Sequence, residues 1–187
     1  MEKQVKFYES IPGVALGTAV LLSIPLVAMQ FTDEVNWGPV DFLIAGLLIF
    51  GAGFAYVMFI RYQSTLVYKA AIASSIGSTF LMVWANLGVG LIGSGPHTGN
   101  LMYIGVVLLL FIGVYLSRFK PAGLERTMFS AALLLLLFAV IQIFAGMHEY
   151  PGSSMAEIIG VNAFFAGLFG FSGLLFRYVV LQQSEDR

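Results

Sequence analysis

Long apolar runs separated by short polar segments dominate this sequence. A helix needs about 20 mostly apolar residues to cross a hydrocarbon core of about 30 Å. Six stretches reach that length: residues 12–31, 39–62, 66–92, 99–119, 122–147 and 155–180. Little chain remains for a soluble domain. The pattern therefore predicts an all-α, polytopic membrane helix bundle, a single transmembrane domain over residues 1–187 with six transmembrane helices arranged as three hairpins.

Helix-start signals support these divisions. Pro12, Pro39 and Pro121 suit the first turn of a helix, where a missing N–H costs no hydrogen bond. With Pro39 at the first helical position, Asp41 falls at the third, where a carboxylate accepts from free amides and interacts favourably with the helix dipole. The segment from Ser154 to Glu157 reads as a capping box at the start of the last span.

Composition assigns the class of protein. Hydrophobic residues make up 59% of the 187 residues, charged residues only 10%, and the mean hydropathy is +0.90. These values lie far from those of a water-soluble domain and indicate an integral membrane protein. The chain has no Cys, which excludes disulfides, thiolate metal sites and cysteine nucleophiles.

The basic residues predict the orientation. All nine lie near the termini or in the second and fourth loops: Lys3, Lys6, Arg61, Lys69, Arg118, Lys120, Arg126, Arg177 and Arg187. The other three loops have none, but carry five acids: Asp33, Glu34, Asp41, Glu149 and Glu157. By the positive-inside rule both termini are cytoplasmic and the outer face is acidic. The modest positive charge inside suits contact with anionic membrane lipids and does not suggest nucleic-acid binding.

The interior of the spans contains only neutral polar groups. Ionisable residues near a midplane mark proton relays and coupled-ion sites, and their absence from these spans disfavours a proton-coupled pump. For Asn86, Gln142 and Asn162 we expect hydrogen bonds between helices, with ligand binding as the less common alternative.

One apparent catalytic motif fails on distance. Residues 170–173, Gly-Phe-Ser-Gly, resemble the serine motif of rhomboid intramembrane proteases, in which a His activates the Ser. Ser172 lies near the cytoplasmic end of the last span, whereas both His residues are expected outside. The helix from Ser154 to Ser172 spans roughly 27 Å. No hydrogen bond crosses that distance, so we assign no catalytic residue.

Histidines and acids in the outer loops are candidate metal ligands. His97, His148 and Glu149, with Asp33, could bind a divalent metal at the external face, and a metal with an open position activates water. The pattern is weak because no two of them have the spacing that places ligands on one helical face. The sequence suggests no structural role for Asp33 and Glu34, so these two acids are candidates for ligand binding.

Several segments resemble an uncharacterised family of small bacterial inner-membrane proteins. They are the external loop Thr-Asp-Glu-Val-Asn-Trp at 32–37, residues 84–94, residues 100–103, and the stretch from Phe164 and Phe165 to Phe176 and Arg177. The similarity covers about residues 31–180. It implies the bacterial inner membrane and the topology given above, and no activity. It also implies that His97 is a weaker shared ligand than Asp33, Glu34, Asn36, Trp37 and Asn86.

These patterns favour a non-enzymatic inner-membrane protein that binds a small ligand or a cation, or serves as an accessory subunit. The expected binding residues are Asp33, Glu34, Asn36, Trp37, Asn86 and Asn100. Residues 91–96 could close a shallow outward cavity beside Asn86. One alternative is a membrane-embedded metal-dependent hydrolase, and another is a channel or facilitator lined by serines of the third span. Expected partners are membrane lipids, a second copy of the chain or another membrane protein.

Overall fold

The computed structural model describes residues 2–62, 65–93 and 97–185, with residues 2–9 through their backbone alone. Within these ranges the chain is helical and contains no strand. The helices are α1 (Glu2–Ala28), α2 (Pro39–Ile60), α3 (Leu66–Gly88), η1 (Thr98–Leu101), α4 (Met102–Ser117), α5 (Pro121–Phe144), η2 (Met147–Glu149) and α6 (Met155–Glu185). Six of them are long and apolar enough to cross a membrane. The predicted class, an all-α membrane protein with six spans, is confirmed.

Helix boundaries agree with the turn signals at most positions. Pro39 and Pro121 are the first residues of α2 and α5, and Glu157 donates its N–H to Ser154 Oγ at 3.1 Å. The prediction for Pro12 was wrong, because α1 begins at Glu2 and contains Pro12 in its interior. A proline inside a membrane helix is tolerated, because neighbouring groups and local adjustments satisfy the freed backbone atoms.

The chain divides into two compact units, Met1–Gln63 and Ser64–Arg187, called unit 1 and unit 2 below. In unit 1, α1 packs against α2 through small residues of α2. A Cβ on Gly53 would lie 2.8 Å from Val14 Cγ1, and one on Gly46 would lie 3.3 Å from Leu22 Cδ1. The two helices therefore approach closely where α2 has glycine.

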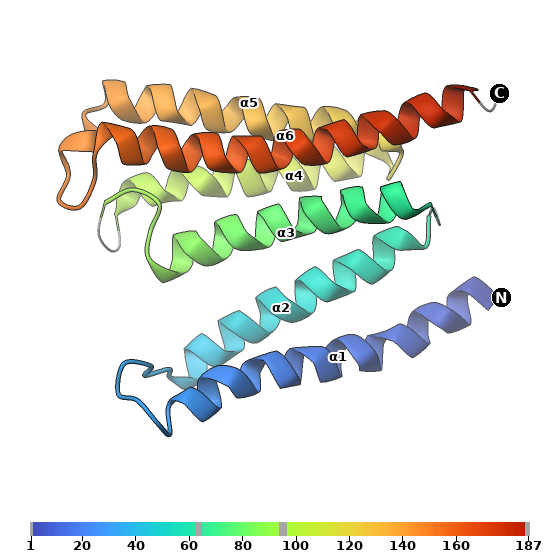
Figure 1. Cartoon of the computed structure of the whole chain (residues 1–187), viewed down its shortest axis with the longest axis horizontal. Helices are drawn as coiled ribbons and strands as arrows, with labels where there is room; N and C mark the ends of the chain where they lie inside the picture. The colour runs from blue at the N-terminus through green and yellow to red at the C-terminus, as the bar shows by residue number, and fades with distance from the viewer. Residues whose placement is uncertain (1, 63–64, 94–96, 186–187) are drawn as a thin grey trace. The chain divides into compact units, whose positions relative to one another are not determined.

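Unit 2 contains α3, α4, α5 and α6, connected in antiparallel succession (Figure 1). Helix α5 packs between α4 and α6, and α6 also packs on α3. Contacts between α3 and α4 are few, although these helices are consecutive in the chain. The chain between them consequently crosses from one side of the unit to the other.

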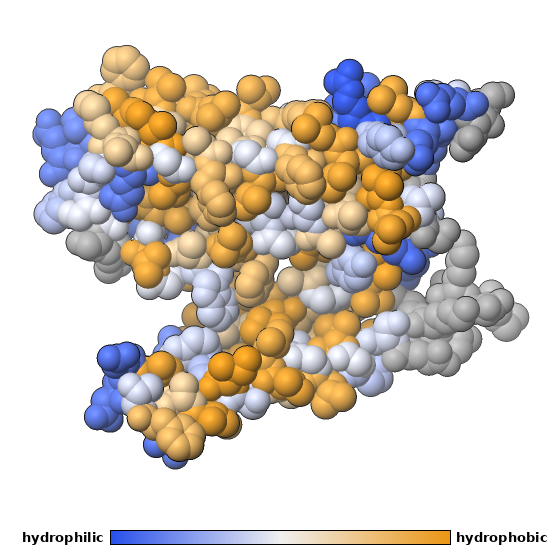
Figure 2. Space-filling view, in the orientation of Figure 1, coloured by the Kyte–Doolittle hydropathy of each residue, from blue (hydrophilic) through white to orange (hydrophobic). Residues whose placement is uncertain are grey.

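Aliphatic and aromatic side chains cover the outer surface of the helices. In each unit Figure 2 shows hydrophobic residues along the helices and hydrophilic residues gathered at an end. Leu116, Tyr115 and Phe111 on α4 are 72%, 81% and 71% exposed. A water-soluble domain does not expose apolar surface on this scale, and lipid chains are the solvent that suits it. The chain is a multi-pass membrane protein.

A ring of three side chains joins α4, α5 and α6. Tyr103 Oη donates to Asn162 Oδ1 at 3.3 Å, Asn162 Nδ2 donates to Gln142 Oε1 at 2.8 Å, and Gln142 Nε2 donates to Tyr103 Oη at 3.3 Å. All three residues are buried, and Asn162 Nδ2 also donates to the Ile158 carbonyl at 2.9 Å. The hydrogen bonds between helices predicted for Gln142 and Asn162 are confirmed.

Serines join α3 to α6. The hydroxyl groups of Ser74 and Ser172 lie 2.8 Å apart, and Ser172 also donates to the Leu168 carbonyl. Ser75 and Ser78 donate to the carbonyls four residues earlier in α3. Their hydroxyl groups thus serve packing and local hydrogen bonding, and Ser172 has a serine as its side-chain neighbour.

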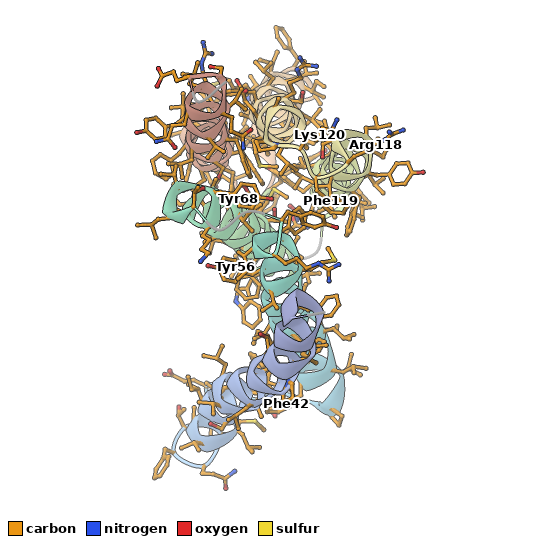
Figure 3. The ribbon with its side chains drawn as sticks, turned by 90° about the vertical axis from the view of Figure 1, so that its right-hand side faces the viewer. Phe42, Tyr56, Tyr68, Arg118, Phe119 and Lys120 are labelled. Carbon is orange, nitrogen blue, oxygen red and sulfur yellow. The ribbon has the colours of Figure 1, made fainter. Side chains whose placement is uncertain are left out.

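The turn from α4 to α5 is short and conformationally costly. Arg118 and Phe119 both adopt left-handed backbone conformations, with φ of 47° and 63°. Each such residue other than glycine costs roughly 1–2 kcal/mol. Ser117 stabilises the turn, because its Oγ accepts from the Phe119 N–H and its carbonyl accepts from the Lys120 N–H. Figure 3 shows Arg118 and Lys120 on this turn at the end of unit 2, where both are exposed.

Candidate functional site

The candidate site lies in unit 2, where the chain leaves α3 and enters α4. Helix α3 ends at Gly88, four residues before the predicted end at residue 92. Gly90 and Gly93 have φ of 78° and 68°, conformations that favour glycine and turn the chain out of the helix. Ser94, Gly95 and Pro96, which the sequence expects to close a cavity here, lie outside the described residues. His97 caps the start of η1.

Asn100 holds this connection in place. Its Oδ1 accepts from the backbone N–H groups of Leu91 and Ile92 at 2.9 and 2.8 Å, and its Nδ2 donates to the Ile92 carbonyl at 3.3 Å. The residue is 7% exposed. The Asn100 amide, expected from the sequence to orient a ligand, is therefore used to fix the loop. The ligand contact of Asn100 stays a prediction.

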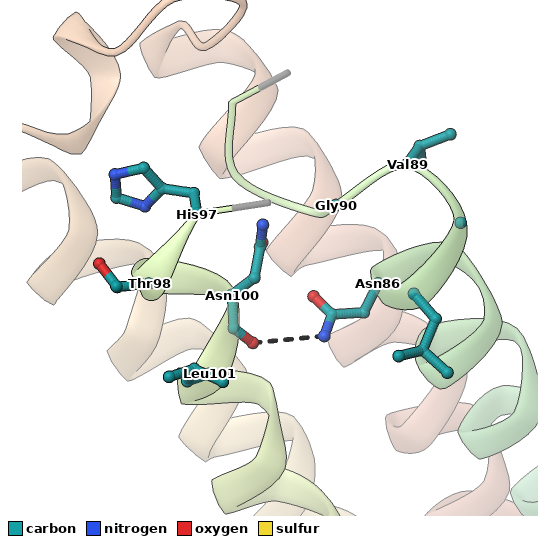
Figure 4. Close-up of a pocket in the computed structure, with 9 residues that line it drawn as sticks. Asn86, Val89, Gly90, His97, Thr98, Asn100 and Leu101 are labelled. Carbon is teal, nitrogen blue, oxygen red and sulfur yellow. Dashed lines mark hydrogen bonds between the residues drawn. The ribbon is translucent and has the colours of Figure 1, made fainter. Parts of the chain in front are cut away.

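A cleft of about 630 Å³ lies beside this connection (Figure 4). Its walls are the last turn of α3, the residues that follow it and η1. The lining residues are Asn86, Leu87, Gly88, Val89, Gly90, His97, Thr98, Asn100 and Leu101. None of them is Asp, Glu, Lys or Arg. Leu87, Val89 and Leu101 give the walls an aliphatic character.

Asn86 carries the unusual feature of the cleft. Its Nδ2 donates to the Asn100 carbonyl at 3.3 Å, the hydrogen bond drawn in Figure 4. This contact fixes the orientation of the amide. Its Oδ1 is buried, and no donor in the described part of the chain reaches it. A buried carbonyl oxygen without a donor costs about 1–3 kcal/mol, so this atom is the strongest sign of a missing partner.

His97 lines the opposite side of the cleft, and in Figure 4 its ring points away from Asn86. Its Nδ1 accepts from the Gly99 N–H at 2.9 Å, and the ring lies over Tyr150 with centroids 4.2 Å apart. This contact ties η1 to the loop between α5 and α6. His97 therefore has a structural role and retains only Nε2 for a further partner.

The other metal candidates are neighbours in sequence. His148 Nε2 lies 3.9 Å from Glu149 Oε1, and His148 Nδ1 is buried without a partner among the described residues. Within those residues, no group of three His, Asp or Glu side chains is placed to hold a metal ion. The divalent metal site on His97, His148 and Glu149 stays a prediction that the described geometry does not favour.

The remaining candidates belong to the loop between α1 and α2 in unit 1. Asp33, Glu34 and Asn36 are exposed, and the Glu34 N–H donates to Thr32 Oγ1 at 3.1 Å. Trp37 packs edge-on against Phe42, with ring centroids 5.3 Å apart. The third acid has the structural role predicted for it, because Asp41 Oδ2 accepts from the Gly38 N–H at 2.8 Å.

Sequence reasoning missed the residues that shape the cleft around Asn86. Val89, Thr98 and Leu101 carry no chemical signal on their own, and their placement depends on the separation of α3 from α4. The sequence feature that could have indicated them is the segment from Gly88 to Gly90, where α3 ends.

Comparison with known proteins adds no assignment. No protein-family model, no curated protein and no solved structure matches the chain.

Proposed function

We propose that this chain is a non-enzymatic, multi-pass protein of the bacterial inner membrane that binds a small polar ligand in the outer cleft of unit 2. The observation that carries the proposal is Asn86 Oδ1, a buried acceptor of fixed orientation without a donor, in a residue that lines the cleft. Pockets for small ligands combine apolar walls with a few placed polar groups, and this cleft has both.

The acidic outer loops support a position of the cleft at the outer face of the membrane. The cleft lies at the α3–α4 connection, which the distribution of Lys and Arg assigns to the outer face. Asp33 and Glu34, exposed on the first outer loop, add negative charge to that face and attract cations over a distance of about a Debye length. Asn36 and Trp37 lie on the same loop, and we include them among the residues that contribute to ligand binding.

A cleft-filling substitution tests the proposal. Gly88 lines the cleft, and a Cβ built there meets no atom within 4 Å outside its own helix backbone and chain neighbours. Gly88→Leu should therefore fill the space without disturbing the fold. Gly160→Leu, on α6 and equally open, is the matched control.

The measurement is saturation-transfer NMR of the purified full chain in detergent, with a panel of propylammonium, propanol, propionamide and propionate. We expect at least one probe to bind, and Gly88→Leu to remove its signal while Gly160→Leu keeps it. Absence of binding by all four probes, or binding that Gly88→Leu leaves unchanged, would overturn the proposal.

A further inference from the structure

We infer that the cleft of unit 2 selects a ligand that donates hydrogen bonds from a positively charged head, with a small alkylammonium ion as the chemical class. The inference rests on the proposed function and adds the charge and polarity of the ligand. Two independent features of the cleft lead to it.

The first feature is the direction of the Asn86 amide. An amide offers two donors and one acceptor oxygen, and in Asn86 the Nδ2 side is engaged by the Asn100 carbonyl. The oxygen of the same amide, Oδ1, has no donor among the described residues. A partner of this atom must donate a hydrogen bond. A carboxylate has no proton to give at neutral pH.

The second feature is the end of α3. The last carbonyl groups of a helix lack partners in the helix and form the negative end of its dipole. Here the Val89 N–H closes the turn on the Ala85 carbonyl at 3.0 Å. The next three residues, Asn86, Leu87 and Gly88, all line the cleft. The negative end of α3 therefore lies at the cleft and favours a cation there.

Three backbone N–H groups near this end already have acceptors. Asn100 Oδ1 engages the N–H groups of Leu91 and Ile92, and His97 Nδ1 engages that of Gly99. Among the described residues, no Lys or Arg lines the cleft. Thr98 contributes a hydroxyl group that donates or accepts, so it does not oppose a cation.

The walls specify the rest of the ligand. Leu87, Val89 and Leu101 are 60%, 70% and 62% exposed and face the cleft or its rim. An aliphatic tail of a few carbons covers such side chains and removes apolar surface from water, which favours binding. A head that donates and a short apolar tail together describe an alkylammonium ion.

The test compares probe molecules of similar shape and different charge. Propylammonium and propionate have similar size and opposite charge, and propanol is a neutral donor. Binding to the full chain in detergent is measured by saturation-transfer NMR titration. We expect propylammonium to bind about tenfold or more tightly than propionate, because propionate has no hydrogen to donate to Asn86 Oδ1 and its charge is repelled by the negative end of α3.

Asn86 variants assign the effect to its oxygen. Asn86→Leu should weaken propylammonium binding about tenfold or more, whereas Asn86→Asp, which keeps an oxygen acceptor, should retain or tighten it. Gln183→Leu, at an exposed glutamine near the end of α6, is the control and should leave binding unchanged. Circular dichroism and gel filtration confirm that each variant folds.

The outcomes separate this inference from the proposed function. If propionate or propanol binds as tightly as propylammonium, and Gly88→Leu abolishes that binding, the cleft is a ligand site of another class and the inference is overturned alone. If Asn86→Leu binds propylammonium as the native chain does, the inference is also overturned. If none of the probes binds, both proposals fall.

Discussion

At the scale of single residues, a closed ring of side-chain hydrogen bonds joins three helices of unit 2. In the ring of Tyr103, Gln142 and Asn162 each residue both donates to and accepts from another member. Such closed arrangements are cooperative, because each bond polarises the next. The ring therefore fixes α4, α5 and α6 relative to one another where lipid provides no competing partner.

Removing one hydroxyl from this ring should be costly. Tyr103→Phe leaves Asn162 Oδ1 without its donor and removes the acceptor of Gln142 Nε2, so we expect the free energy of unfolding to fall by about 1–3 kcal/mol. Tyr115→Phe, on the same helix but 81% exposed, should change it by less than about 0.5 kcal/mol. Equal effects of the two substitutions in urea or detergent unfolding would show that the ring is not stabilising.

Replacing the whole ring should cost less than breaking it. The triple variant Tyr103→Phe, Gln142→Met and Asn162→Leu leaves no member of the ring with an unsatisfied polar atom. We therefore expect it to unfold with a higher free energy than Tyr103→Phe alone, by about 1 kcal/mol. A triple variant less stable than the single one would indicate that shape, and not hydrogen bonding, is what the three residues supply.

At the scale of helices, close approach depends on glycine at a few positions. A Cβ on Gly113 of α4 would overlap Thr127 Cγ2 of α5, whereas one on Gly105 would lie 3.5 Å from Phe138 Cζ, an ordinary contact. Both glycines are on α4 and face α5. Near the turn, a Cβ on Gly123 would overlap Ser117 Cβ. Helices α4 and α5 are thus closest towards their connection.

This contrast gives a matched pair of substitutions. Gly113→Ala inserts a methyl group into occupied space and should lower the free energy of unfolding by about 1–3 kcal/mol. Gly105→Ala should be neutral or slightly stabilising, because alanine favours the helix by roughly 1 kcal/mol. Thermal or chemical unfolding of both variants measures the difference, and a Gly105→Ala loss as large as that of Gly113→Ala would contradict the packing argument.

At the scale of the whole molecule, hydropathy located all six helices because the hydrocarbon core demands long apolar segments. Hydropathy did not show that α3 packs on α6 and makes few contacts with α4, because this packing depends on side-chain fit between distant segments. The hydrogen bonds of Gln142 and Asn162 were predictable, because a polar group in a span needs a partner. Tyr103 was not identified, because a tyrosine near the end of a span has the same signature as an interfacial anchor.

The cleft shows the same limit of prediction from the sequence. Asn86 and Asn100 were expected at one site, and they do contact each other. Their roles divide according to geometry, with Asn100 holding the loop and Asn86 keeping a buried oxygen without a donor among the described residues. The sequence contains both amides, and both line the cleft, but it does not show which hydrogen bonds each amide makes there.

The distribution of charge predicts the orientation of the chain in the membrane, and the lack of cysteine makes this prediction measurable. Single substitutions Asn36→Cys, Glu149→Cys and Lys120→Cys each introduce the only thiol of the chain at an exposed position. The first two lie in acidic loops assigned to the outer face, and the third lies in a basic loop assigned to the cytoplasm. In bacterial spheroplasts, a membrane-impermeant maleimide should label the first two at once and Lys120→Cys only after lysis. Labelling of Lys120→Cys in intact spheroplasts would reverse the topology and place the cleft on the cytoplasmic side.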